Sequence, residues 1–211
     1  MSDRLIKAFL ALMFIFPSAG CRRQDPLVVP DEPINDIHVS AKPISEPLPG
    51  DTALTYANVV PYGIGADQKV FIQSRMSRIM NRIDKRESFA ICIGKDDCPW
   101  CARAVPVLYQ TAEEMNVTVE YVDLSDDYSW RTEDQAESFD RFIELGRDNM
   151  RADENGDKQF FIPCVICIRN GTVADMHVST LDNDDLETEF SDEQKGKLKQ
   201  IYYSGFIRAG L

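Results

Sequence analysis

The chain has 211 residues, of which 44% are hydrophobic and 27% are charged, and this composition excludes a wholly disordered or collagen-like protein. The length is sufficient for one domain and about 60 further residues. Acidic residues outnumber basic residues by 35 to 23, so the net charge of -12 argues against nucleic acid as a partner. One local basic patch, on a predicted helix, is interpreted as a solvent-exposed face; its members are Arg75, Arg78, Arg82, Lys85 and Arg86.

Residues 1–21 are predicted to be a signal peptide. Arg4 and Lys7 precede an apolar run from Ala8 to Phe16, which is too short to span a bilayer but suits a secretory signal. The small residues before Cys21 resemble the bacterial lipoprotein signal, in which the cysteine is acylated, although Ser18 stands where Leu is most common. The sequence therefore predicts export and a lipid anchor at Cys21. An ordinary cleaved signal peptide, leaving Cys21 as an incidental thiol, is the alternative.

Residues 22–58 are predicted to be a disordered, Pro-rich tether. The stretch from Arg22 to Gly50 holds six of the 11 prolines and no aromatic residue. Such a segment buries too little apolar surface to fold, and in an extended form it would hold a domain away from a membrane anchor. The folded domain is assigned to residues 59–211, with its start expected between Thr55 and Gln68.

The domain is predicted to alternate helices and strands, because apolar residues recur first at helical and then at strand spacing. Capping-box spacing at Thr132 and Gln135, and again at Ser191 and Gln194, predicts two helix starts, and Asn170-Gly171 predicts a hairpin turn. The expected elements are a helix over 72–83, a strand at 89–93, a helix from Cys98 to Met115, a strand at 117–122, a helix over 132–150, strands at 162–168 and 172–178, and a terminal helix after Ser191. Helices should therefore flank a mixed sheet.

The chemistry of the domain is expected to rest on the motif Cys98-Pro99-Trp100-Cys101. A strand followed by this motif at the start of a helix places the first sulfur where free N–H groups and the helix dipole favour a thiolate. The second sulfur, one turn later, can attack a mixed disulfide formed at the first. Cys98 is thus the predicted nucleophile and Cys101 the predicted resolving thiol, and no cofactor is required because the two sulfurs carry both electrons. A structural disulfide or half of a metal site remains open.

Three further features accompany this motif: Pro106 five residues after Cys101, the pair Ile162-Pro163, and Asn170-Gly171 after it. From Phe89 to Val178 the chain thus resembles the thioredoxin superfamily. It is also similar to small Gram-positive thioredoxin-like lipoproteins of the bacteriocin transport accessory or thiol-disulfide isomerase type. The resemblance implies an α/β, thioredoxin-like fold, a cis-proline at Pro163 facing the cysteines, and protein thiol or disulfide substrates. A redox partner is implied as well. Pro99, Trp100, Ile162 and Pro163 would contact the substrate.

The chain also departs from that family. Cys92 stands where thioredoxins carry a buried Asp that assists proton transfer to the resolving thiol, so the usual general base is missing. Cys164 replaces the Thr after the cis-proline, and Ser179 replaces a Gly in the substrate-binding loop. The segment between Asp123 and Pro163 is longer than in thioredoxins and should insert an extra helix before the cis-proline strand.

The remaining cysteines are interpreted individually. Cys92 and Cys167 are expected to be buried core residues. Two roles remain open for Cys164: an auxiliary thiol beside the active site, or the third ligand of a metal site with Cys98 and Cys101.

The sequence as a whole predicts a thiol-disulfide oxidoreductase on the outer face of the cytoplasmic membrane, or a secreted or periplasmic one without the lipid. The alternatives are a metal-binding or metallochaperone module that uses the three cysteines, and a non-catalytic accessory lipoprotein with the same fold.

Overall fold

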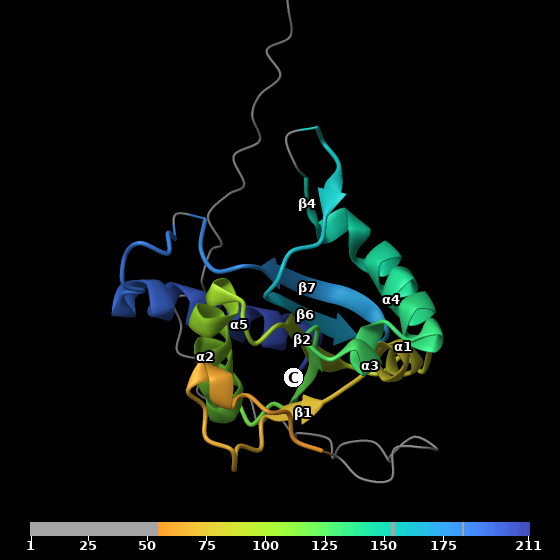
Figure 1. Cartoon of the computed structure of the whole chain (residues 1–211), viewed down its shortest axis with the longest axis horizontal. Coiled ribbons are helices and arrows are strands. Elements are labelled where there is room, and N and C mark those ends of the chain that lie inside the picture. The colour runs from red at the N-terminus through yellow and green to blue at the C-terminus, as the bar shows by residue number, and fades with distance from the viewer. Residues whose placement is uncertain (1–54, 153–154, 183) are drawn as a thin grey trace, which may run out of the picture. The chain divides into compact units, whose positions relative to one another are not determined.

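The computed structural model describes residues 55–152, 155–182 and 184–211 (Figure 1). The predicted signal peptide at 1–21, with Cys21, lies outside the described residues, as does nearly all of the predicted tether at 22–58.

Five strands form one mixed sheet in the order β1-β3-β2-β6-β7. β1 and β2 run parallel to β3, whereas β6 is antiparallel to β2, and β7 is antiparallel to β6. The central strands carry almost only buried side chains because both faces of the sheet are covered. The strands are β1 (Phe71–Gln73), β2 (Phe89–Gly94), β3 (Val119–Asp123), β6 (Cys164–Arg169) and β7 (Thr172–Val178).

Helices cover the two faces of the sheet, with α2 against α5 on one side and α1 against α4 on the other (Figure 1). A hairpin of two short strands follows α4. The helices are α1 (Met76–Asp84), α2 (Pro99–Glu114), α3 (Asp127–Trp130), α4 (Glu133–Gly146) and α5 (Asp192–Ala209), with 3-10 turns η1 (Val60–Tyr62) and η2 (Arg147–Asn149) and hairpin strands β4 (Arg151–Ala152) and β5 (Lys158–Gln159). Within the described ranges, no helix is long and apolar enough to cross a membrane.

This arrangement confirms the expected fold class. A mixed central sheet lies between helices, the Ile162-Pro163 peptide bond is cis, and α4 is the extra helix before the strand that follows Pro163. The Asn170-Gly171 turn is also confirmed, since both residues have positive φ values, 51° and 77°. A Cβ on Gly171 would lie 2.5 Å from the carbonyl oxygen of Ile83, so the turn requires glycine for space as well as for conformation.

Two predicted elements are corrected. Ile72, expected in the first helix, lies in β1, and the helix begins only at Met76. The helix after Thr132 ends at Gly146 instead of reaching residue 150, and its predicted capping box is absent. The amide of Gln135 turns away instead, accepting the Ser77 N–H at 2.8 Å and donating to the Ser77 hydroxyl at 2.8 Å, which ties α4 to α1. The capping box of Ser191 and Gln194 is present.

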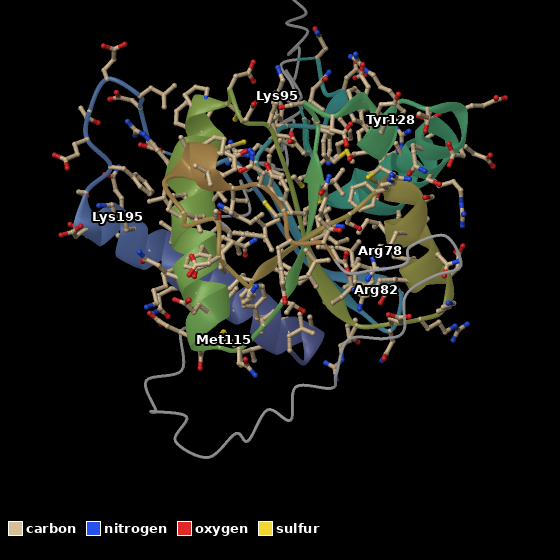
Figure 2. All side chains as sticks on the ribbon, turned by 60° about the horizontal axis from the view of Figure 1, so that its bottom comes forward. Arg78, Arg82, Lys95, Met115, Tyr128 and Lys195 are labelled. Atoms are coloured by element: carbon tan, nitrogen blue, oxygen red, sulfur yellow. The ribbon has the colours of Figure 1, made fainter. Side chains whose placement is uncertain are left out.

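The interpretation of the basic patch as solvent-exposed is wrong for two of its members (Figure 2). Arg78 is 5% exposed and donates two hydrogen bonds, each 3.1 Å, to the carboxylate of Glu120, which is 2% exposed. Arg82 donates to the same carboxylate at 2.5 Å and to Glu87 at 2.7 Å. Both guanidinium groups therefore serve an internal ion-pair network between α1 and β3.

Candidate active site

Cys98 is the N-cap residue of α2, directly after the loop that leaves β2. Its backbone is extended, and its sulfur accepts a hydrogen bond from the backbone N–H of Cys101 at 3.2 Å. The side chain is half-buried, so an outside disulfide can reach it. An N–H group at the start of a helix, directed at a sulfur, stabilises the negative charge of a thiolate. The structure thus places Cys98 at the start of α2, as the motif predicts, with one N–H donor at its sulfur.

The loop with the cis-proline lies against Cys98. The sulfur of Cys98 donates to the carbonyl oxygen of Ile162 at 4.0 Å. The carbonyl oxygen of Pro163 accepts the N–H of Ser179 at 2.7 Å, and Ser179 has a φ of 68°, in the left-handed region. Ser179 therefore holds the backbone conformation that glycine favours and fastens the loop beside the nucleophile.

Several apolar residues belong to the two segments that meet where Cys98 contacts the carbonyl of Ile162. Pro99 is exposed, and Trp100 and Ile162 are half-buried, whereas Pro163 is buried. Phe161, directly before this pair, is 46% exposed. Sequence reasoning missed Phe161, although an apolar residue outside a strand and next to an X-Pro pair is a signal that could have identified it. The exposed and half-buried members of this set are accessible for apolar contacts with a polypeptide.

Cys101 lies one turn inside α2 and is fully buried. Burial raises the pKa of its thiol, and the hydrogen bond with Cys98 adds to the increase, while a backbone N–H from Lys95 acts against it. Both sulfurs are free thiols. Cys101 is thus inaccessible to an outside disulfide but lies next to the one sulfur that it would have to attack.

Cys92 lies on the same face of the sheet as Cys101. In the strand register it is the neighbour of Tyr121 on β3 and of Val165 on β6, and Val165 is in turn the neighbour of His177 on β7. Cys92 is fully buried, and this burial raises the pKa of its thiol. The position that the sequence resemblance matches to the buried Asp of thioredoxins is therefore occupied by a buried thiol.

Two tyrosines that the sequence did not indicate complete this face. The hydroxyls of Tyr62 and Tyr121 are 2.6 Å apart, and both side chains are buried. Tyr62 comes from η1, 59 residues before Tyr121. No local pattern connects two residues so far apart, so only the folded structure could reveal the pair.

The expectations for Cys164 are corrected. Alternate residues of a strand face opposite sides of the sheet, and Cys164 packs with Ile166 and Ile168 on the side of α1, whereas Cys92 and Cys101 lie in the cluster on the side of α2. Cys164 is fully buried there, so it can neither be an auxiliary thiol in the groove nor complete a metal site with Cys98 and Cys101. In the described part of the chain, no group of three His, Cys, Asp or Glu side chains could hold a metal ion. Cys167 is buried, as expected.

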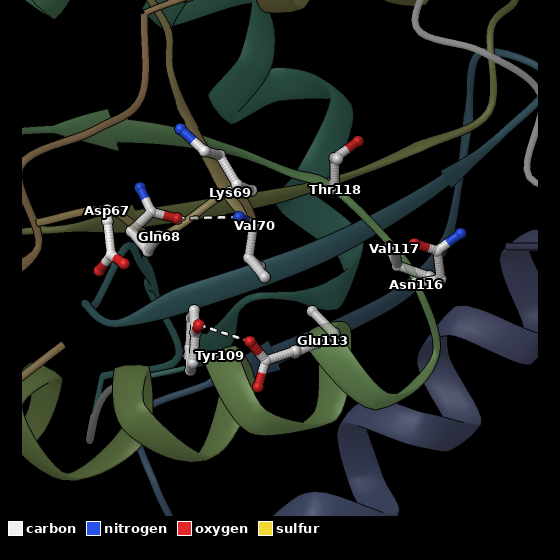
Figure 3. A pocket seen from close by; sticks show the side chains of 10 residues that line it. Asp67, Gln68, Lys69, Val70, Tyr109, Glu113, Asn116, Val117 and Thr118 are labelled. Atoms are coloured by element: carbon white, nitrogen blue, oxygen red, sulfur yellow. Dashed lines mark hydrogen bonds between the residues drawn. The ribbon is translucent and has the colours of Figure 1, made fainter. Parts of the chain in front are cut away.

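The structure has a cavity of about 300 Å³ away from the cysteines (Figure 3). It lies between the end of α2 and the segment that leads into β1, and polar side chains line much of it. Tyr109 donates to Glu113 at 2.6 Å along one side, and Gln68 is occupied by hydrogen bonds to the backbone of Val70 and Phe71. The site around Cys98 therefore remains the candidate for chemistry.

No family model matches the chain, and no curated protein matches it. Solved structures of thioredoxins are similar to it. The thioredoxin of Aeropyrum pernix is 15% identical over 49% of this chain and 71% of that chain, with a TM-score of 0.34. Thioredoxin O2 of Arabidopsis thaliana is 14% identical over 63% and 94%, with a TM-score of 0.35, and the oxidised thioredoxin of Plasmodium falciparum is 14% identical over 64% and 99%, with a TM-score of 0.36. The fold class assigned above rests on the strand order and connections of this chain.

Cys92→Ala tests whether the buried thiol has a chemical role. We expect the free energy of unfolding to fall by about 1 to 3 kcal/mol, as for other small deletions in a core, and the rate of disulfide reduction to change by only a few fold. Denaturant unfolding and a reductase assay measure the two effects. Cys167→Ala, which removes another buried thiol from the same face, is the matched control. A large loss of rate in a folded Cys92 variant, absent from the control, would give Cys92 a part in the chemistry.

Proposed function

We propose that the protein is an extracytoplasmic thiol-disulfide oxidoreductase that exchanges disulfides with protein substrates. The observation that carries this proposal is the placement of Cys98. Its sulfur is partly accessible, accepts the Cys101 N–H at 3.2 Å at the start of α2, and lies beside the cis-proline loop. An accessible sulfur with an N–H donor and a second thiol behind it is what reversible disulfide exchange requires.

In the reducing direction, the thiolate of Cys98 attacks one sulfur of a substrate disulfide. A mixed disulfide forms, and the other substrate sulfur leaves as a thiolate. Cys101 then attacks the sulfur of Cys98, closing the Cys98–Cys101 disulfide, and its proton ends on the departing substrate thiolate. Two electrons have passed from the cysteine pair to the substrate, and a dithiol redox partner restores the pair. With the substrate as dithiol, the same steps run in reverse.

In this proposal the substrate contacts Pro99, Trp100, Ile162 and Pro163, and we add Phe161 because its side chain is 46% exposed. Exposed apolar side chains next to a reactive sulfur favour contact with an unfolded or extended polypeptide. The alternative of a metal-binding module is not carried forward, because Cys164 lies on the other side of the sheet.

A turnover assay with a protein disulfide and excess dithiol tests the proposed activity. Cys98→Ser should abolish turnover, because the attacking sulfur is removed, whereas Cys167→Ser should leave the rate close to that of the wild type. Equal turnover in wild type and Cys98→Ser would overturn the proposal and favour a non-catalytic accessory protein.

The proposed location is the outer face of the cytoplasmic membrane, with a lipid on Cys21. This part rests on the short apolar run and the small residues before Cys21. Cys21→Ala should be released from the membrane fraction or retained as an unprocessed precursor, and it should lose metabolic lipid labelling. Equal labelling of the wild type and the variant would contradict the anchor.

A further inference from the structure

The resolving step poses a problem that the described residues around Cys101 must solve, if the proposed function is right. Cys101 has to become an anion in order to attack Cys98, but its side chain is fully buried, and burial raises the pKa of its thiol. The strand position below it carries the thiol of Cys92 instead of a carboxylate. One backbone N–H, from Lys95, lowers this pKa, but a buried anion with no further hydrogen bonds or charges beside it is costly.

Polar groups of another kind lie beside Cys101. They lie next to Gly94, the last residue of β2. A Cβ built on Gly94 would lie 3.1 Å from the hydroxyl oxygen of Tyr121 and 3.5 Å from the sulfur of Cys101. The hydroxyl of Tyr121 and the sulfur of Cys101 thus face the same small space at the end of β2. A side chain at this position would fill that space, so glycine leaves the space between the hydroxyl and the sulfur open.

The hydroxyl pair has one hydrogen to spare. Tyr62 and Tyr121 together carry two hydroxyl hydrogens, and the bond of 2.6 Å between them uses one. The hydrogen of the accepting hydroxyl remains available for a second acceptor. Burial is the main cause that raises the pKa of Tyr62 and of Tyr121, so both hydroxyls stay protonated and act as donors.

We propose that the Tyr62–Tyr121 pair directs its free hydroxyl hydrogen at the sulfur of Cys101 and stabilises the thiolate that attacks Cys98. The two tyrosines are positioning residues, since they act on Cys101 and do not touch the substrate. In a water-poor site, a fixed O–H dipole stabilises a developing anion more than it would in water. The proton of Cys101 still ends on the departing thiolate, so the tyrosines are unchanged by each turnover.

Other titratable groups face the same region, and their effects on Cys101 must be distinguished from those of the tyrosine pair. They are Cys98 on α2, Cys92 on β2, Tyr202 on α5 and Asp123 at the end of β3. Asp123 is the charged competitor, because a carboxylate near the pair could act as a base. Its side chain accepts the N–H of Ser125 at 2.8 Å. Replacing it by Asn keeps its shape and removes its charge.

The experiment is a stopped-flow reaction of the reduced full-length protein, carrying Cys21→Ala, with a chromogenic aromatic disulfide. Cys98 releases the first coloured thiolate, and Cys101 releases the second when it resolves the adduct, with its proton passing to the buffer. Tyr121→Phe, and the double variant with Tyr62→Phe, should slow the second phase about tenfold at neutral pH, the size expected for a hydrogen bond to a charged group. The pH profile of that phase should shift to higher pH, while the first phase stays unchanged.

The controls make each outcome decisive. The double variant leaves no buried hydroxyl without its partner and should therefore fold even where a single variant is unstable. Tyr109→Phe, on the same helix as Cys101 but bonded to Glu113, should leave both phases unchanged. A second phase of wild-type rate and pH profile in the double variant overturns the inference, as does a larger effect in Asp123→Asn. If the wild type shows no second phase, or Cys101→Ser retains it, the proposed function fails instead.

Discussion

Cys101→Ser should convert the protein into a trap for its substrates. The variant retains Cys98 at the start of α2, so the first attack and the mixed disulfide still form. The second attack is lost, because a serine hydroxyl does not displace a thiolate, and that attack is normally favoured by a neighbour held at high effective concentration. We expect about tenfold or more adduct compared with the wild type. Non-reducing electrophoresis, with the adducts released by a reductant, measures it.

The matched variant is Cys98→Ser, which should trap little because Cys101 is fully buried. Cys92→Ala belongs in the background of both variants, since Cys92 is a buried thiol on the same face of the sheet as Cys101. Replacement of Cys164 is unnecessary, because it lies on the opposite face. The assigned roles are wrong if Cys98→Ser captures partners as well as Cys101→Ser does.

Glu120→Ala should cost about 3 to 5 kcal/mol of the free energy of unfolding, the range for one partner removed from a buried ion pair. The substitution removes the carboxylate to which Arg78 donates twice and Arg82 once. Arg78 is buried and cannot turn its charge to water without leaving the interface between α1 and β3. Denaturant unfolding, read as the midpoint at an unchanged slope, measures the loss.

Asp84→Asn provides the comparison for that effect. Asp84 accepts from Arg141 at 2.9 Å on the surface, where both side chains are about half exposed, and exposed pairs contribute about 0 to 1 kcal/mol. A Glu120 variant no less stable than the Asp84 variant would show that water or other groups compensate Arg78. High salt should change the stability loss of Glu120→Ala little, since buried ion pairs are screened little.

The parts of the fold that follow from local spacing could be predicted from the sequence. The helix after Cys101, the strand from Phe89 and the turn at Asn170-Gly171 each carry their signal within a few residues. β1 was missed because three residues are too few to show alternation, and Ile72 also fits the spacing of the helix that follows.

In the candidate site, the relations between residues close in sequence could be predicted, but the contacts between distant segments could not. Cys98 and Cys101 are only three positions apart, so their relation to the start of α2 follows from the motif. The face on which Cys164 lies depends on the strand register, and the pairing of Tyr62 with Tyr121 depends on the packing of η1 on the sheet. Likewise, the partner of Arg78 lies on a strand 42 residues away. Such contacts are settled only by tertiary structure.

The burial of Cys92, Cys164 and Cys167 on two separate faces of the sheet also fixes an order of events for oxidative maturation. Once the sheet is packed, those three buried sulfurs are out of reach of oxidants, and among the described cysteines only Cys98 and its neighbour Cys101 remain open to oxidation. Before packing, every sulfur of the nascent chain competes for the same oxidant. In the compartment proposed above, correct oxidation therefore requires the core to pack before its thiols are oxidised. The buried cysteines therefore make the yield of correctly oxidised protein depend on the rate at which the chain folds.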